Sequence, residues 1–210
     1  MGIIIKNYLD VDTILGIWEI TEDYNSLMSL VNLNNEDHER LNSFRNHKRK
    51  LEWLSVRALA TNLAGKNVRI IYNENRKPLL EDNSHQISIS HSNNLTSILL
   101  SKKKKVGIDL EYMSHRISSI AFKFINEREY ITRDPGRIRY HLYVHWCAKE
   151  AMYKICDKQD INFKKNLTIK PFHLNDRGQM EGIVSNIHGR EKFNLSYFKL
   201  DNYAVAWCIK

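Results

Sequence analysis

The sequence predicts a mixed α+β fold in two parts. Strand-like segments open and close the chain, two long segments have the apolar spacing of helices, and two segments resemble hairpins with asparagine in their turns. The hairpin-like segments cover residues 87–101 and 193–209, so each would close one half of the chain. Any two hairpins share this pattern, and it leaves an internal duplication open.

The first half predicts short strands around one long helix. Asn34 and Asn35 are of a type that caps helix N-termini, Gly65 is of a type that ends helices, and apolar side chains recur between them at helical spacing. In order, the expected elements are strands at 3–5 and 15–20, a helix from Glu36 to Gly65, a strand at 68–72, a turn at 73–78 and a hairpin at 87–100 that turns at 92–94.

The second half predicts a strand, two helices and a return to strands. The stretch from Ile138 to Cys156 contains neither Pro nor Gly, so nothing in it would interrupt a helix. Lys102–Lys105 precede this half and are expected to form a solvated loop. In order, the expected elements are a strand at 106–111, helices at 117–130 and 138–156, and strands at 168–172, 193–200 and 204–209, with a turn at 201–202.

Composition indicates a globular protein that binds anions. Of the 210 residues, 42% are hydrophobic and 27% charged, and the net charge is +8. A basic surface of this kind suits nucleic acid, a phosphorylated small molecule or an acidic protein. No apolar run reaches the roughly 18 residues of a membrane span. The short apolar start lacks a cleavage site, and the three cysteines show no CxxC spacing. We therefore expect a cytoplasmic protein without a disulfide framework or a zinc site.

Asp109 and Glu111 are two residues apart in an extended segment, so the pleat directs both carboxylates to one face. Their neighbours Ile108 and Leu110 point the other way, towards a core. Two carboxylates about 4 Å apart repel by roughly 4 kcal/mol near a protein surface, so a pair held in a cleft favours a hard cation such as Mg²⁺. An exposed strand face would give the same pattern, and these two residues leave both interpretations open.

Glu150 and Lys154 lie four residues apart in the expected helix at 138–156, so they share one helix face, with Trp146 one turn earlier. Glu150 could act as a third oxygen ligand or as a base, and Lys154 could bind a phosphate. An ordinary surface pair worth about 0.2–0.5 kcal/mol is the alternative.

Three further groups suit a phosphate or a nucleotide, and each also has an ordinary structural explanation. The hydroxyl of Ser90 beside the imidazole of His91 could bind phosphate oxygens. Pro78 could present Lys77 to a ligand, and the basic helix turn at 48–50 could bind phosphate. The alternatives are ordinary turn chemistry for the first group, a solvated turn for the second and a solvated helix face for the third. The groups are Ser90-His91, Lys77-Pro78 and Lys48-Arg49-Lys50.

The order and spacing of these motifs are more specific than any one of them. The chain contains RKP (76–78), SISHS (88–92), VGIDLE (106–111), FINEREY (124–130) and WCAKEAMYK (146–154), with a looser match in KRKLEWLSVRALA (48–60). In this order they resemble the 4′-phosphopantetheinyl transferase superfamily, in its surfactin-synthetase-activating (Sfp-like) branch. The matching segments span Arg76 to Lys154, and beyond Lys154 only the general pattern agrees.

The resemblance implies a fold and an activity. The fold would consist of two similar α/β halves, residues 1–103 and 104–210, related by a pseudo-twofold axis, with coenzyme A bound between them. The activity would be that of a holo-[acyl-carrier-protein] synthase, which moves the 4′-phosphopantetheine arm of coenzyme A to a serine of an apo acyl or peptidyl carrier protein. Adenosine 3′,5′-bisphosphate is the second product. The branch usually works as a monomer, and the carrier's pathway (fatty acid, polyketide or nonribosomal peptide) stays open.

The resemblance also implies roles for individual residues. Asp109, Glu111 and Glu150 would ligand Mg²⁺, with Mn²⁺ as an alternative ion. Lys154 would contact the pyrophosphate, and Glu150 is a candidate proton acceptor. The remaining coenzyme A contacts would come from Ser90 and His91 at the phosphates, Lys77 and Pro78 beside the adenine, and one of Lys48, Arg49 and Lys50 at the 3′-phosphate. Glu129 matches an acidic position to which the resemblance gives no definite role.

Two other function classes fit part of the pattern. A metal-dependent nuclease also uses paired acids and a lysine, and a basic nucleic-acid-binding protein would show strongly salt-dependent affinity without turnover. Neither explains why the Lys-Pro, Ser-His and Glu-Lys pairs occur together in this order. We therefore expect neither nucleic acid nor a membrane as the partner.

Overall fold

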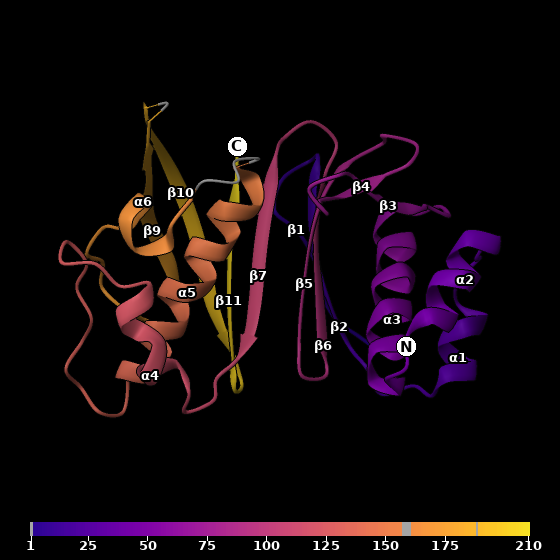
Figure 1. Ribbon diagram of the computed structural model, residues 1–210, viewed down its shortest axis with the longest axis horizontal. Helices are drawn as coiled ribbons and strands as arrows, with labels where there is room; N and C mark the ends of the chain where they lie inside the picture. The colour runs from indigo at the N-terminus through magenta and orange to yellow at the C-terminus, as the bar shows by residue number, and fades with distance from the viewer. Residues whose placement is uncertain (1, 157–160, 188) are drawn as a thin grey trace. The chain divides into compact units, whose positions relative to one another are not determined.

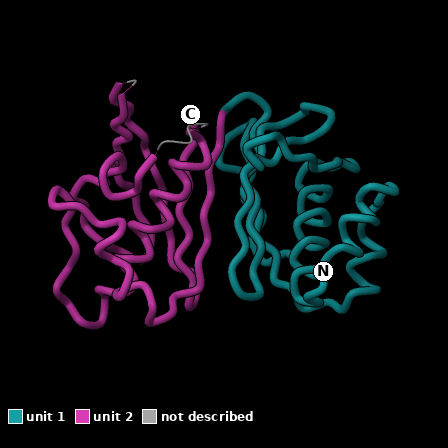
Figure 2. The backbone as a smooth tube through the Cα atoms, viewed as in Figure 1, with its two compact units in different colours: residues 1–104 teal, residues 105–210 magenta. Residues whose placement is uncertain are grey.

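The computed structural model describes residues 2–156, 161–187 and 189–210. The chain divides into two compact units, the first ending at Lys104 and the second beginning at Lys105 (Figure 2). Each unit has its own antiparallel sheet and its own apolar core. The prediction of a mixed α+β protein is therefore confirmed, whereas the pseudo-twofold relation between the halves stays a prediction.

Unit 1 is a four-stranded sheet covered by helices. Its strands lie in the order β1-β2-β6-β5, and α3 packs on β2 and β6, with α1 against α3. The elements are β1 (Ile3–Tyr8), β2 (Thr13–Glu19), α1 (Tyr24–Ser29), α2 (Asn35–Ser43), α3 (His47–Ala64), β3 (Ile70–Tyr72), β4 (Pro78–Leu80), β5 (Gln86–Ser92) and β6 (Leu95–Ser101). Strands β3 and β4 form a separate small ribbon.

The long helix expected from Glu36 to Gly65 is wrong in its continuity, because the chain forms two helices there. Phe44 takes an extended conformation with ψ 118°, and the Asn46 side chain accepts a hydrogen bond from the Lys48 amide, which begins a new helix. Leu41 and Leu54 nevertheless belong to the same core, so the apolar spacing continues across the break. Gly65 ends the second helix at φ 68°, as its position predicted.

Unit 2 is a five-stranded sheet crossed by one long helix. The strand order is β7-β11-β10-β9-β8, and α5 packs mainly on β7 and β11 (Figure 1). The elements are β7 (Val106–Tyr112), α4 (Ile117–Ile120), the 3-10 turn η1 (Ala121–Lys123), α5 (Ile138–Ile155), α6 (Phe163–Asn166), β8 (Leu167–Ile169), β9 (Arg177–Asn186), β10 (Gly189–Leu200) and β11 (Tyr203–Ile209). No described helix is long and apolar enough to cross a membrane.

The helix expected over residues 117–130 is also wrong. Only α4 and η1 are helical, and the chain after them is irregular. Polar side chains of this stretch also bond to distant backbone: Asn126 donates to the Leu167 carbonyl over 3.1 Å, and Glu129 accepts from the Ile169 backbone amide over 2.8 Å. These tertiary hydrogen bonds replace the helical ladder that the local sequence favoured.

Both expected hairpins are confirmed, and two strands, β4 and β9, were missed. β5 pairs with β6, and β10 with β11, around turns in which Asn93 and Asp201 adopt positive φ values of 53° and 48°. β9 was not expected because its sequence, RGQMEGIVSN, contains two glycines and little alternation. In the structure it lies between β10 and β8 and completes the sheet beneath α5.

Candidate functional site

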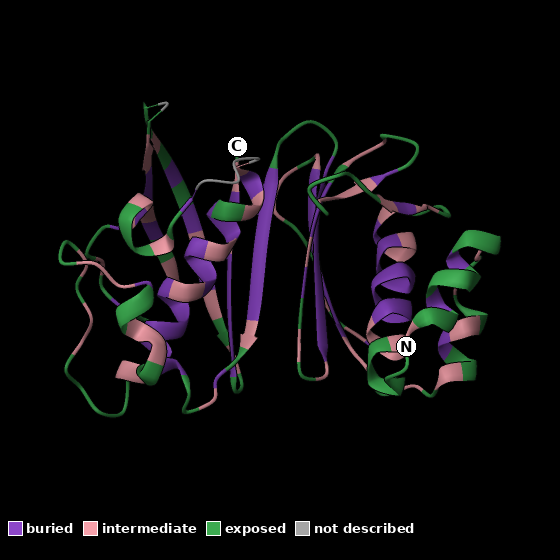
Figure 3. Ribbon diagram, in the orientation of Figure 1, coloured by how far each residue is buried: buried purple, intermediate pink, exposed green. Residues whose placement is uncertain are grey.

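Strand β7 directs its acids towards helix α5. Residues 107, 109 and 111 share one face of the pleat, and Asp109 and Glu111 lie opposite Ala206 and Ala204 of β11. The small alanines belong to the core that α5 covers, and Ile108 and Leu110 are fully buried on the other face. Figure 3 shows β7 buried along most of its length. The alternation predicted from the sequence therefore holds.

Gly107 lets the helix come close to the strand. A Cβ atom built at this position would overlap the Ala151 carbonyl oxygen of α5 and lie 3.0 Å from Ile155 Cγ1. Only a residue without a side chain leaves room for backbone at that distance. The glycine of the VGIDLE motif thus sets how closely Asp109 approaches the residues of α5.

Lys154 pairs with Asp109. Its ammonium donates to Asp109 Oδ1 over 2.8 Å and to the Ile108 carbonyl over 2.8 Å. Asp109 is 4% exposed, so this charge-assisted bond forms away from bulk water and is stronger than a surface pair. The structure therefore brings together an acid of the predicted strand motif and the lysine of the predicted helix motif.

Glu150 lies within the electrostatic field of the same group. Burial, together with the negative charges of Asp109 and Glu111 and against the opposing charge of Lys154, raises the pKa of Glu150 to about 7. A carboxylate with a pKa near neutrality can both accept and release a proton at physiological pH. Glu150 thus has the acid-base character expected of a proton acceptor.

The donor chemistry of these acids fits magnesium, although the assembled coordination sphere is not present. Three carboxylates offer the hard oxygen ligands that Mg²⁺ prefers. Among the described residues, however, no group of three or more His, Cys, Asp and Glu side chains is arranged to hold a metal ion. The Lys154 ammonium instead neutralises Asp109. Metal ligation by Asp109, Glu111 and Glu150 therefore stays a proposal.

In unit 1, the start of α3 meets the end of β5. Arg49 Nη1 lies 2.5 Å from His91 Nε2 and 3.2 Å from a carboxylate oxygen of Glu52. Lys48 reaches the Asn93 side chain over 3.5 Å. An arginine and a histidine held side by side present N–H donors of the kind that phosphate oxygens accept. Of the three basic residues at 48–50, Arg49 is the one that the structure places against the Ser-His motif.

The other predicted residues of unit 1 lie on β5, in the turn before β4, at the start of β4 and on α3. Ser90 is buried on β5, and its carbonyl accepts a hydrogen bond from the Ser97 hydroxyl over 3.3 Å. Lys77 lies in the turn before β4, where its amide donates to the Asn73 side chain, and Pro78 is the first residue of that strand. Lys50 is half-buried in the first turn of α3.

One buried ion pair beside the site was not predicted from the sequence. Lys149, which precedes Glu150, has its ammonium 2.8 Å from Glu129, and both side chains are 0% exposed. The family resemblance implies no definite role for Glu129, and the local sequence predicts none for Lys149. A lysine in a helix is usually exposed, so nothing in the local pattern marked it as buried.

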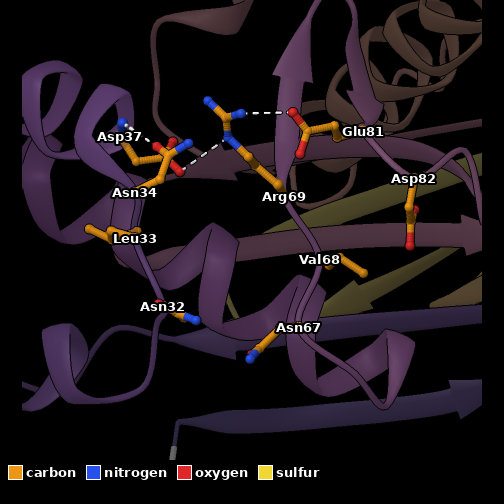
Figure 4. A pocket seen from close by; sticks show the side chains of 9 residues that line it. All are labelled: Asn32, Leu33, Asn34, Asp37, Asn67, Val68, Arg69, Glu81 and Asp82. Atoms are coloured by element: carbon orange, nitrogen blue, oxygen red, sulfur yellow. Dashed lines mark hydrogen bonds and ion pairs between the residues drawn. The ribbon is translucent and has the colours of Figure 1, made fainter.

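A polar pocket in unit 1 was also not expected. Figure 4 shows Arg69 between Asp37 and Glu81, with the asparagines at 32, 34 and 67 around it. The guanidinium contacts Glu36, Asp37 and Glu81, so its charge is compensated within the protein. These ion pairs link α2 to the β3–β4 ribbon, and we assign the pocket no ligand.

The part of the chain that matches a known family is almost all of unit 2. Residues 105–208 match the family model of the 4′-phosphopantetheinyl transferase superfamily. The match supports assignment to that superfamily. The matched range covers β7, α5 and every candidate site residue of unit 2. A search of curated proteins found no match to the chain.

Members of the phosphopantetheinyl transferase superfamily use coenzyme A as substrate, generally with a divalent metal, and act on carrier proteins. The match therefore supports phosphopantetheinyl transfer in general.

Proposed function

We propose that this protein transfers the 4′-phosphopantetheine arm of coenzyme A to a serine of an apo acyl or peptidyl carrier protein, as a member of the Sfp-like branch. The observation that carries the proposal is the meeting of Asp109 and Lys154 beside Glu150, which joins the two most specific motifs at one place. We expect the enzyme to be cytoplasmic and monomeric.

The reaction requires charge stabilisation and a proton acceptor. The serine oxygen forms a bond to phosphorus, the bond from phosphorus to the pyrophosphate bridge breaks, and adenosine 3′,5′-bisphosphate leaves. Lys154 would hold the pyrophosphate through its ammonium, which partly neutralises charge developing on the leaving oxygen. Glu150 would accept the serine proton, as its pKa of about 7 permits. The nucleophile belongs to the carrier, so the chain itself needs no activated Ser or Cys.

Magnesium, when bound, would supply electrostatic stabilisation of the pyrophosphate. Asp109, Glu111 and Glu150 are the side chains that would hold it, and Mn²⁺ has similar ligand preferences. In unit 1, Arg49 and His91 would bind the 3′-phosphate of coenzyme A, because their N–H groups lie together at the end of β5. The further candidates for coenzyme A contacts are Ser90, Lys77, Pro78, Lys48 and Lys50.

The basic surface suits the proposed partner. The chain carries a net charge of +8, and an acidic carrier protein would be drawn to it before specific contacts form. This attraction would act mainly on the rate of association and would weaken at high salt.

The deciding experiment combines the protein with an apo carrier protein, coenzyme A and Mg²⁺, followed by mass spectrometry of the carrier. We expect a gain of one phosphopantetheine mass. No gain with acyl and peptidyl carriers from several pathways would refute the proposal. Asp109→Ala should abolish the gain in a folded protein, and retained transfer would remove Asp109 from the site. Cleavage of DNA or RNA in a parallel incubation would instead support a nuclease.

A further inference from the structure

Helix α5 presents two different faces, and the WxxKEAxxK motif supplies both of them. Trp146 and Lys149 are three residues apart, and both contact the segments that contain Phe124 and Phe163: Trp146 packs on the two rings at 5.1 Å and 5.5 Å between centroids. Glu150 is rotated about 100° from Lys149. Glu150 therefore shares a helix face with Lys154, whose ammonium donates to Asp109 of β7.

The ammonium of Lys149 is held at three points. It donates to the Phe124 carbonyl, to the Phe163 carbonyl over 3.3 Å and to a carboxylate oxygen of Glu129 over 2.8 Å. An ammonium has three N–H donors, and each has an acceptor here. The side chain is fully buried, so water does not compete for these bonds.

Glu129 is held just as completely. One carboxylate oxygen accepts hydrogen bonds from Lys149 and from the backbone amide of Asn126, each over 2.8 Å. The other oxygen accepts from the backbone amide of Ile169 over 2.8 Å. The pair therefore ties α5 to the irregular segment after η1 and to strand β8. These bonds restrict rotation of α5 about its axis, one residue before Glu150.

We propose that Glu129 is a positioning residue: through Lys149 it fixes the rotation of α5 so that Glu150 faces the acids of β7. Glu129 contacts α5 through Lys149, about 100° around the helix from Glu150, and acts on the reaction only through the helix. The inference rests on the proposed function, because it takes Glu150 as a metal ligand and proton acceptor. It assigns a role to the one acidic residue of the FINEREY motif that bonds to α5.

The test compares E129Q with a matched control. Glu129→Gln keeps the size of the side chain and removes its charge. Asp37→Asn does the same to the buried partner of Arg57 in unit 1, which lies outside the proposed site. Both changes should lower the thermal midpoint. Only E129Q should lower kcat for arm transfer, by about tenfold or more, when assayed well below its thermal midpoint. Equal kcat values for E129Q, D37N and the wild type would overturn the inference.

A second readout does not depend on transfer. Free Mn²⁺ measured by electron paramagnetic resonance, with and without coenzyme A, gives the metal affinity of each folded variant. We expect E129Q to weaken Mn²⁺ binding by about tenfold or more and D37N to leave it unchanged. A wild type that binds Mn²⁺ but transfers no arm would refute the proposed function, and weaker binding by E129Q would still support the positioning role.

The double variant Glu129→Gln with Lys149→Met covers the case in which E129Q does not fold. It removes both charges, and an uncharged pair of similar volume is often tolerated where a lone buried charge is not. The positioning role predicts reduced kcat and Mn²⁺ affinity in the double variant as well. A folded double variant with wild-type values for both would overturn the inference.

Discussion

The Lys154 ammonium of α5 donates a hydrogen bond to the Asp109 carboxylate of β7 across 2.8 Å, joining two residues 45 positions apart in the chain. The lysine also donates to the Ile108 carbonyl, so its position is set by the strand backbone as well as by the acid. A cation is thus already held beside the acids in the protein alone. This arrangement stabilises negative charge at the point where the pyrophosphate of coenzyme A is expected.

Replacing Lys154 by Met should lower kcat/KM for arm transfer by about 100-fold or more, because one preorganised cation is lost from a buried site. Steady-state kinetics of carrier modification, in protein shown to be folded by circular dichroism, measures the effect. Lys164→Met removes an exposed lysine of α6 and should leave kcat/KM unchanged. Equal effects of the two substitutions would show that Lys154 contributes only net charge.

Replacing Arg49 by Ala should raise the KM for coenzyme A by about tenfold or more, because a charge-assisted bond to the 3′-phosphate is lost. Coenzyme A that lacks this phosphate should show little further loss with the variant. Lys66→Ala removes the same charge from a lysine that pairs with Asp82, and its KM should match the wild type. An equal loss with both forms of coenzyme A would place Arg49 away from the 3′-phosphate.

Replacing Gly107 by Ala should destabilise the protein by about 3 kcal/mol, because the new Cβ overlaps the Ala151 carbonyl and the helix must move. Urea denaturation measures the change. Gly136→Ala is the control, since its Cβ would approach only the Asp134 side chain, at 3.4 Å, and should alter stability by less than about 0.5 kcal/mol. A stable Gly107→Ala protein would contradict the close approach of β7 and α5.

The buried histidines of α5 should make the protein acid-sensitive. Burial lowers the pKa of His145 to about 3 and the pKa of His141 to about 4, whereas both titrate near 6.5 in the unfolded chain. Between these values the unfolded state binds more protons, so the free energy of unfolding falls as pH drops from about 6.5 towards 4. Each histidine contributes about 1.4 kcal/mol for each pH unit.

Replacing His145 by Leu tests this pH dependence. The slope of stability between pH 6 and 4, from urea denaturation, should decrease by about 1.4 kcal/mol per pH unit. Replacing the exposed His38 by Gln should leave the slope unchanged. An unchanged slope in the His145 variant would show that this imidazole already takes up a proton in the folded state.

Chelation of divalent metal should abolish arm transfer without unfolding the protein. The acids of β7 already face a cation in Lys154, so the fold needs no metal to compensate Asp109. Excess EDTA should therefore stop modification of the carrier and shift the thermal midpoint by no more than about 2 °C, and added Mg²⁺ should restore transfer. A large fall in the midpoint would indicate a structural metal instead.

Local patterns predicted the parts of the site that depend on spacing. The alternation of VGIDLE placed both acids on one strand face, and the spacing of Glu150 and Lys154 placed them on one helix face. The asparagine-containing turns predicted both hairpins. Each of these features follows from a repeat of two or 3.6 residues, so a short stretch of sequence contains all the information needed.

Tertiary contacts decided the rest. The segment at 124–137 is irregular because its polar groups bond to β8 and α5, and α2 and α3 separate because Asn46 caps a new helix within a continuous apolar pattern. Lys149 is buried only because Glu129 and two carbonyls surround its ammonium. The sequence by itself determined which side chains share a face. Which face turns towards the acids depends on partners far away in the chain, since burial and long-range hydrogen bonds exist only in the folded protein.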